Sequence, residues 1–193
     1  MKELLLIGTT VFALASGSLT AATNHAQQYP ERPQRGNHVS VATLQRLEIR
    51  AQDAIDAAKM EQLRAKGIEV KKALDKLSTH VDKTWYVFSG NTPSGWDCSG
   101  LTMWFYEQLG IELEHRASVQ DDAGVKTSDP KPGDLVVFKY NGSKQAYHVG
   151  IYVGDGKMIH APKHGHLTRI ENIEKFGGKY SKISYRKIIE TNL

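Results

Sequence analysis

Apolar side chains recur along the chain with two different spacings. Between residues 41 and 81 they recur every three or four positions, which is the period of an α-helix. The repeat slips once near Gly67, so the pattern predicts either one long helix with a stutter or two helices. Val70, Leu74 and Leu77 give the second half enough apolar surface to dock on a globular core. We expect this segment to pack on its own domain; pairing with a partner protein through residues 41–81 is the alternative.

From about residue 82 the spacing becomes that of a compact α+β domain. An amphipathic helix is predicted between Asp97 and Gly110. Short apolar runs separated by turn residues predict a loop at 89–95 and strands at 135–140, 146–153, 157–162 and 183–189. The segment GDG at 154–156 predicts a tight hairpin turn. A helix followed by antiparallel strands is an α+β order, so we predict a domain over 82–193 preceded by the helical segment.

The first 40 residues have neither pattern. Residues 4–15 form an apolar run that follows Lys2 and precedes small residues, which is typical of a secretory signal or of an uncleaved anchor. Residues 23–40 are polar and rich in proline, as in a linker. We therefore predict a signal-like or anchoring segment at 1–22, a linker at 23–40, and a protein that is secreted, periplasmic or attached to the cell envelope.

Charge and cysteine content exclude several classes of function. The net charge is +4, and no run of Lys and Arg is dense enough to predict nucleic-acid binding. A single cysteine excludes an intramolecular disulfide framework and a zinc site with several thiolate ligands. The segment HAPKHGH holds three histidines, but such a polar loop is more typical of solvated side chains. We predict neither a metal nor a cofactor.

The single cysteine, Cys98, directly follows a residue that favours helix starts. Asp97 is a good N-cap, so Cys98 is predicted in the first turn of the helix. The unpaired amides of that turn favour negative charge, which predicts a lowered thiol pKa and a nucleophilic thiolate. Burial as a small apolar core residue is an equally good interpretation of the position alone.

Two histidines complete a candidate catalytic set. Strand alternation places His148 on the face opposite Val149 and Ile151, away from the main core. The predicted hairpin brings His160 onto the neighbouring strand, about 5 Å away. A nucleophilic thiolate requires a base and a group that orients the base. The three residues together predict a nucleophile, Cys98, with His148 as its base and His160 as the orienter.

Several of these segments resemble one family. GWDCSGLTMWFYEQLGIEL, PGDLVVF and HVGIYVGDGKMIHAP, within about residues 83–173, resemble the NlpC family of papain-like cell-wall cysteine peptidases. The resemblance implies a papain-like fold in which the helix packs near an antiparallel sheet. It also implies the same three catalytic residues. The segment WYVFSG matches the family's aromatic segment, which assigns Tyr86 to the oxyanion region, although it departs from the family pattern at Trp85, Phe88 and Ser89.

The resemblance also implies a substrate, the peptide stem of bacterial peptidoglycan. The expected reaction is hydrolysis of the bond between γ-D-glutamate and a diamino acid. Asp97 and Ser99 match positions that bind the substrate's amine or backbone, and Ser118 and Gln120 match a segment that borders the groove. Loop and helix capping is the alternative role for these last two residues. The alternative function is that of a structural component of an envelope or a phage tail, which docks on cell wall with or without hydrolysis. For a phage-tail component the location would be a virion.

Overall fold

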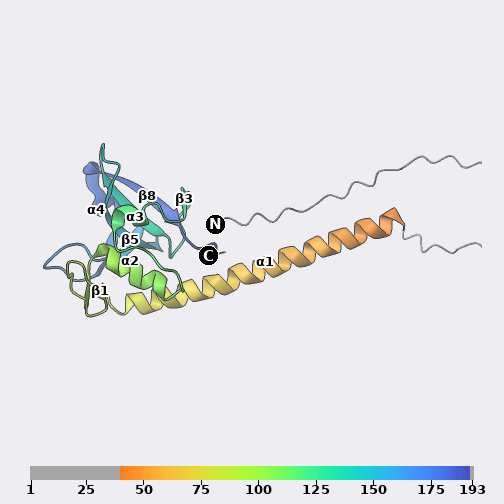
Figure 1. The fold of residues 1–193 in the computed structure, drawn as a ribbon, viewed down its shortest axis with the longest axis horizontal. Helices are drawn as coiled ribbons and strands as arrows, with labels where there is room; N and C mark the ends of the chain where they lie inside the picture. The colour runs from red at the N-terminus through yellow and green to blue at the C-terminus, as the bar shows by residue number, and fades with distance from the viewer. Residues whose placement is uncertain (1–39, 192–193) are drawn as a thin grey trace, which may run out of the picture. The chain divides into compact units, whose positions relative to one another are not determined.

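The computed structural model describes residues 40–191 (Figure 1). The predicted signal-like segment, and all of the predicted linker except Ser40, lie outside the described residues. Among the helices of residues 40–191, none is long and apolar enough to cross a membrane. The described elements combine helices with antiparallel sheets, so the α+β prediction is confirmed.

Helix α1, Val41–Ser78, is a single uninterrupted helix of 38 residues. Gly67 does not break it, and that residue is buried where the helix reaches the domain. Val70 and Leu77 are buried in the core, whereas residues 41–62 are exposed throughout. The Lys76 ammonium bonds the Gln108 side chain at 2.5 Å and so ties the end of α1 to the end of the next helix. Only the last turns of α1 are therefore held by the domain.

The domain consists of a six-stranded antiparallel sheet, a two-stranded sheet and short helices. The helices are α2 (Cys98–Glu107), α3 (Ala117–Gln120), α4 (Ile173–Gly177) and the 3₁₀ helix η1 (Gly178–Tyr180). The large sheet has the order β3-β8-β4-β5-β6-β7. Its strands are β3 (Val125–Thr127), β4 (Leu135–Tyr140), β5 (Ala146–Gly154), β6 (Lys157–His160), β7 (Arg169–Asn172) and β8 (Ser181–Lys187). The small sheet pairs β1 (Asn91–Thr92) with β2 (Gly95–Trp96).

The predicted strands and hairpin are present, and the elements that the sequence did not predict are short. Asp155 and Gly156 have φ angles of 52° and 66°, as a two-residue hairpin turn with right-handed strand twist requires. The prediction of a loop at 89–95 was wrong in part, because this segment contains most of the β1–β2 hairpin. Strand β7 was missed since its four residues, RIEN, carry charges on a polar sheet edge instead of an apolar run.

Two apolar clusters cover the two faces of the large sheet. Helix α2 and the end of α1 bury one face, with a core formed by Leu77, Trp96, Leu101, Phe105, Leu135, Val137, Val149, Ile151 and Ile159. The other face carries a smaller cluster of Val136, Phe138, Met158 and Ile173. The His148 ring contacts the Phe138 ring of this second cluster, with centroids 5.7 Å apart, so the predicted alternation along β5 is confirmed.

The unequal docking of α1 makes a testable prediction. We expect Leu77→Ala to lower the free energy of unfolding by about 2–5 kcal/mol, because it opens a cavity in the core. Leu47→Ala is the matched control on the same helix. Leu47 is 53% exposed and Leu77 is 0% exposed, so the control should stay within about 0.5 kcal/mol of wild type. Urea unfolding followed by circular dichroism measures both, and equal losses would contradict this docking.

Candidate active site

Asp97 fixes the start of α2 and therefore the position of Cys98. Its backbone is extended, and its Oδ1 accepts a hydrogen bond from the Gly100 N–H at 2.8 Å. Cys98 is consequently the first residue of α2, as its sequence position predicts. The Cys98 side chain is half-buried and free of any disulfide. Backbone hydrogen bonds from Val149, Ser99 and Cys98 itself reach its sulfur.

The thiol pKa is raised, and the predicted lowering is wrong. Burial raises the pKa of Cys98 to about 11, and the neighbouring Asp97 carboxylate raises it further by repelling a thiolate. Backbone hydrogen bonds, including those of the first helical turn, lower it, so the effect expected from the helix start exists but is outweighed. The resting nucleophile is a neutral thiol that needs a base to remove its proton.

His148 and His160 meet across the β5–β6 hairpin. The His148 Nε2 lies 2.7 Å from the His160 Nδ1, and both side chains are buried. Gly150 makes this approach feasible, because a Cβ there would lie 3.1 Å from the His160 Cβ and 2.9 Å from the Met158 sulfur. His148 makes this contact through its Nε2, which leaves its Nδ1 outside the histidine pair. The Val149 backbone lowers the pKa of Cys98, so β5 carries His148 next to a residue that acts on the thiol.

Burial keeps both imidazoles neutral. The pKa of His148 is well below its usual value because the ring is desolvated and because His160 lies beside it. Burial also lowers the pKa of His160, against the hydrogen bond and charge of Glu171, which raise it. A neutral imidazole is the form that accepts a proton, so His148 is ready to act as a base at neutral pH.

Tyr86 lies near the nucleophile at the partly buried edge of the main core. Burial raises the pKa of its hydroxyl, and Cys98 and Asp97 raise it further. The hydroxyl therefore stays protonated at neutral pH and can donate a hydrogen bond. Tyr86 also pairs with Trp96 through an isolated β-bridge, which fixes its backbone beside the residue before Asp97.

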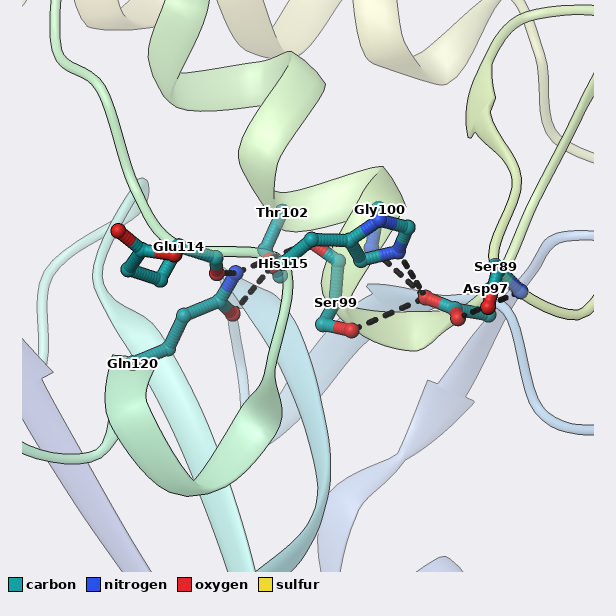
Figure 2. A network of polar contacts seen from close by, with 8 residues as sticks. All are labelled: Ser89, Asp97, Ser99, Gly100, Thr102, Glu114, His115 and Gln120. Atoms are coloured by element: carbon teal, nitrogen blue, oxygen red, sulfur yellow. Dashed lines mark hydrogen bonds and ion pairs between the residues drawn. The ribbon is translucent and has the colours of Figure 1, made fainter.

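Asp97, Ser99 and Gln120, three of the four residues predicted to bind substrate, belong to a polar network around the start of α2 (Figure 2). The Ser99 hydroxyl donates to Asp97 Oδ1 at 3.0 Å. The buried Gln120 amide donates to the Ser99 and Glu114 carbonyls, and its oxygen accepts a 2.6 Å hydrogen bond from Thr102. Gln120 thus joins α3 to the first turns of α2, whereas Ser118 is half-buried on the same short helix and has no side-chain hydrogen bond.

Two polar partners in the site were not predicted. His115 places its Nε2 2.9 Å from Asp97 Oδ1, although only tertiary folding brings these residues together (Figure 2). Glu171 Oε2 lies 3.1 Å from His160 Nε2. The sequence could indicate Glu171 only as a carboxylate on the second strand from His148. Recognising that position requires the β6–β7 register, which the structure provides. Among residues 40–191, no three His, Cys, Asp or Glu side chains are grouped so as to hold a metal ion.

Comparison with known proteins places the chain in a family. The NlpC/P60 family profile matches residues 83–189, more than half of the chain, and the chain belongs to that family. It is 43% identical over 104 residues to a probable endopeptidase p60 of Listeria welshimeri, which covers 52% of this chain and 19% of that protein. It is 37% identical over 111 residues to the murein DD-endopeptidase MepH of Escherichia coli, covering 54% and 41%. The chain thus spans less than half the length of these relatives.

Solved structures of the family share the fold. The NlpC/p60 domain of the peptidoglycan hydrolase SagA superposes with a TM-score of 0.53 at 30% identity, covering 61% of this chain and 98% of that domain. A NlpC/P60 family protein of Bacillus cereus gives 0.56 at 26% identity, covering 62% and 40%. The papain-like architecture predicted from the resemblance is therefore confirmed.

The raised thiol pKa predicts how Cys98 reacts with an alkylating reagent. Because the chain has one cysteine, uptake of iodoacetamide reports this site alone. The rate should rise about tenfold per pH unit between pH 7 and 10, since a thiol with a pKa of about 11 is mostly protonated there. A Cys98→Ala blank and a free thiol of ordinary pKa serve as references. A plateau in rate below pH 8 would mean that a thiolate–imidazolium pair already exists at rest.

Proposed function

We propose that the protein is a cysteine peptidase that hydrolyses peptide stems of bacterial peptidoglycan. This proposal rests on the 2.7 Å hydrogen bond between His148 and His160. His148 lies on β5, and the backbone of the next residue, Val149, lowers the pKa of Cys98. The arrangement supplies a nucleophile, a neutral base and a group that orients the base. The family match and the relatives named endopeptidase support peptidoglycan as the substrate.

The first step couples deprotonation to attack. His148 Nδ1 takes the thiol proton as the Cys98 sulfur adds to the scissile carbonyl, because the raised thiol pKa leaves little thiolate at rest. The oxyanion is held by backbone N–H groups at the start of α2, and the protonated Tyr86 hydroxyl is a further donor. The imidazolium of His148 then gives its proton to the leaving amine. Water activated by the same ring hydrolyses the thioester.

Substrate binding is assigned to the rim of this site. Asp97 Oδ1 accepts hydrogen bonds from Gly100, Ser99 and His115, whereas Oδ2 accepts one, from the Ser89 N–H, so an ammonium group of the stem would meet Oδ2. The half-buried Ser118 and the Gln120 face of α3 would border the peptide. Asp97 would then serve two purposes, as helix cap and as an anionic contact.

The bond that we propose to be cleaved joins γ-D-glutamate to a diamino acid. MepH is named a DD-endopeptidase, which makes a D,D cross-link the second candidate. Either substrate lies outside the cytoplasm, which fits a secreted, periplasmic or envelope location. The exposed residues 41–62 of α1 are the part of the described chain that we assign to a protein partner.

Muropeptide analysis tests the proposal directly. Purified sacculi incubated with wild type should release products that mass spectrometry identifies by the bond lost, with new amino termini on the diamino acid. Cys98→Ala should release none above a buffer blank, because it removes the nucleophile. If wild type binds sacculi but releases no product, the protein is a docking component of an envelope or phage tail instead of an enzyme.

The two histidines should differ in their effect on turnover. His148→Ala removes the proton acceptor and should lower kcat about 1,000-fold or more, within the range of general-base contributions and triad losses. His160→Ala leaves the base in place and should lower kcat by a smaller factor, about 10- to 100-fold. Steady-state hydrolysis of a purified stem peptide measures both, and equal residual rates would contradict these roles.

A further inference from the structure

His160 has a second polar partner on the strand beyond it. Its Nδ1 lies 2.7 Å from His148 Nε2, and its Nε2 lies 3.1 Å from Glu171 Oε2. Strands β6 and β7 pair His160 with Arg169, and Met158 with Glu171, so Glu171 reaches the ring diagonally across the pair. The result is a continuous chain of polar contacts from the edge strand of the sheet to the catalytic base.

The partners of each nitrogen fix where the protons lie. An ionised carboxylate only accepts hydrogen bonds, so the proton in the Glu171 contact belongs to His160 Nε2. A neutral imidazole has one N–H, which leaves His160 Nδ1 as an acceptor. The proton in the His148–His160 contact then belongs to His148 Nε2. The Nδ1 of His148 is left unprotonated, so its lone pair is available to accept a proton.

The two histidines alone do not define which of them donates the hydrogen bond between them. A hydrogen bond between His148 and His160 forms equally well when His160 Nδ1 donates and His148 Nε2 accepts. In that arrangement the proton of His148 sits on Nδ1, and the ring has no lone pair to offer the thiol. A third group that can only accept removes this symmetry, and Glu171 is the group in contact.

The charges around the pair act in opposite directions. Arg169, on the same strand as Glu171, disfavours a protonated His160, whereas the Glu171 carboxylate favours it. The Arg169 Nη2 lies 3.3 Å from His166 Nδ1, so its guanidinium is directed toward that loop. The side chain of Glu171 is 33% exposed while His160 is 0% exposed. The carboxylate therefore keeps its contact with water as it holds a fully buried ring.

We propose that Glu171 is a positioning residue that acts through His160 to keep His148 in the tautomer with an unprotonated Nδ1. The tautomer is a property of the resting protein, and only its catalytic consequence rests on the proposed function. Glu171 does not touch the thiol or the substrate in this scheme. It orients the proton chain from the edge strand β7, on the same face of the sheet as His160.

Nitrogen NMR of the full-length chain reads the tautomer without any substrate. In wild type at pH 7.5, His148 and His160 should both show protonated Nε2 and unprotonated Nδ1. Glu171→Ala should give His148 a population protonated at Nδ1, and the isosteric Glu171→Gln, whose amide can donate or accept, should do the same. Glu174→Gln removes the same charge three residues away at an exposed position and should leave both rings unchanged. Unchanged His148 tautomers in both Glu171 variants would overturn the proposal.

Turnover provides the second readout. Glu171→Gln should lower kcat on the order of 100-fold and change KM less than about threefold. The expected loss in kcat is larger than for a typical outer hydrogen-bond partner and smaller than for a carboxylate bonded directly to the base. Glu174→Gln should retain wild-type kcat. A loss in Glu171→Gln that appears in KM alone would also overturn the proposal. Absence of hydrolysis in wild type would contradict the proposed function, yet would leave the NMR result decisive for Glu171.

Discussion

The carboxylate of Asp97 is the constraint on which the rest of the site depends. Its Oδ1 accepts hydrogen bonds from Gly100, Ser99 and His115, and its Oδ2 accepts one from the Ser89 N–H. These contacts start α2, close the preceding loop and tie down the segment before α3 (Figure 2). The same charge raises the pKa of Cys98. The group that positions Cys98 therefore also adds to the effect of burial, which raises the pKa of the thiol most.

The residue proposed as the base, His148, lies on β5 of the large sheet and is buried. Strand β5 directs Val149 and Ile151 into the core under α2, and directs His148 to the opposite face. Burial there lowers the pKa of His148 while burial on the other side raises that of Cys98. Thiol and imidazole are both neutral at rest for the same physical reason, desolvation of their charged forms. In the mechanism that we propose, proton transfer therefore accompanies attack on the carbonyl.

The long helix has a separate relation to the domain. The family match begins at residue 83, so α1 lies outside it. Ala73 and Leu77 bury the last turns of α1 in the same cluster as Leu101 and Phe105 of α2, and this contact supports the helix that carries Cys98. The exposed first half contributes no packing to the domain. The packing of α1 on the domain thus depends on about the last third of the helix.

The sequence by itself determined the local features of this protein. The cap at Asp97, the strands β4 to β6, their hairpin turn and the pairing of His148 with His160 follow from capping, period-two alternation and turn chemistry, which act over a few residues. Only the tertiary structure decided the rest. The sign of the Cys98 pKa shift depends on how deeply the sulfur is buried. The contact of Glu171 depends on β7, a strand that the sequence did not predict, and that of His115 depends on how the segment before α3 packs against α2. Desolvation and long-range register are properties of the packed chain, and no spacing of residues encodes them directly.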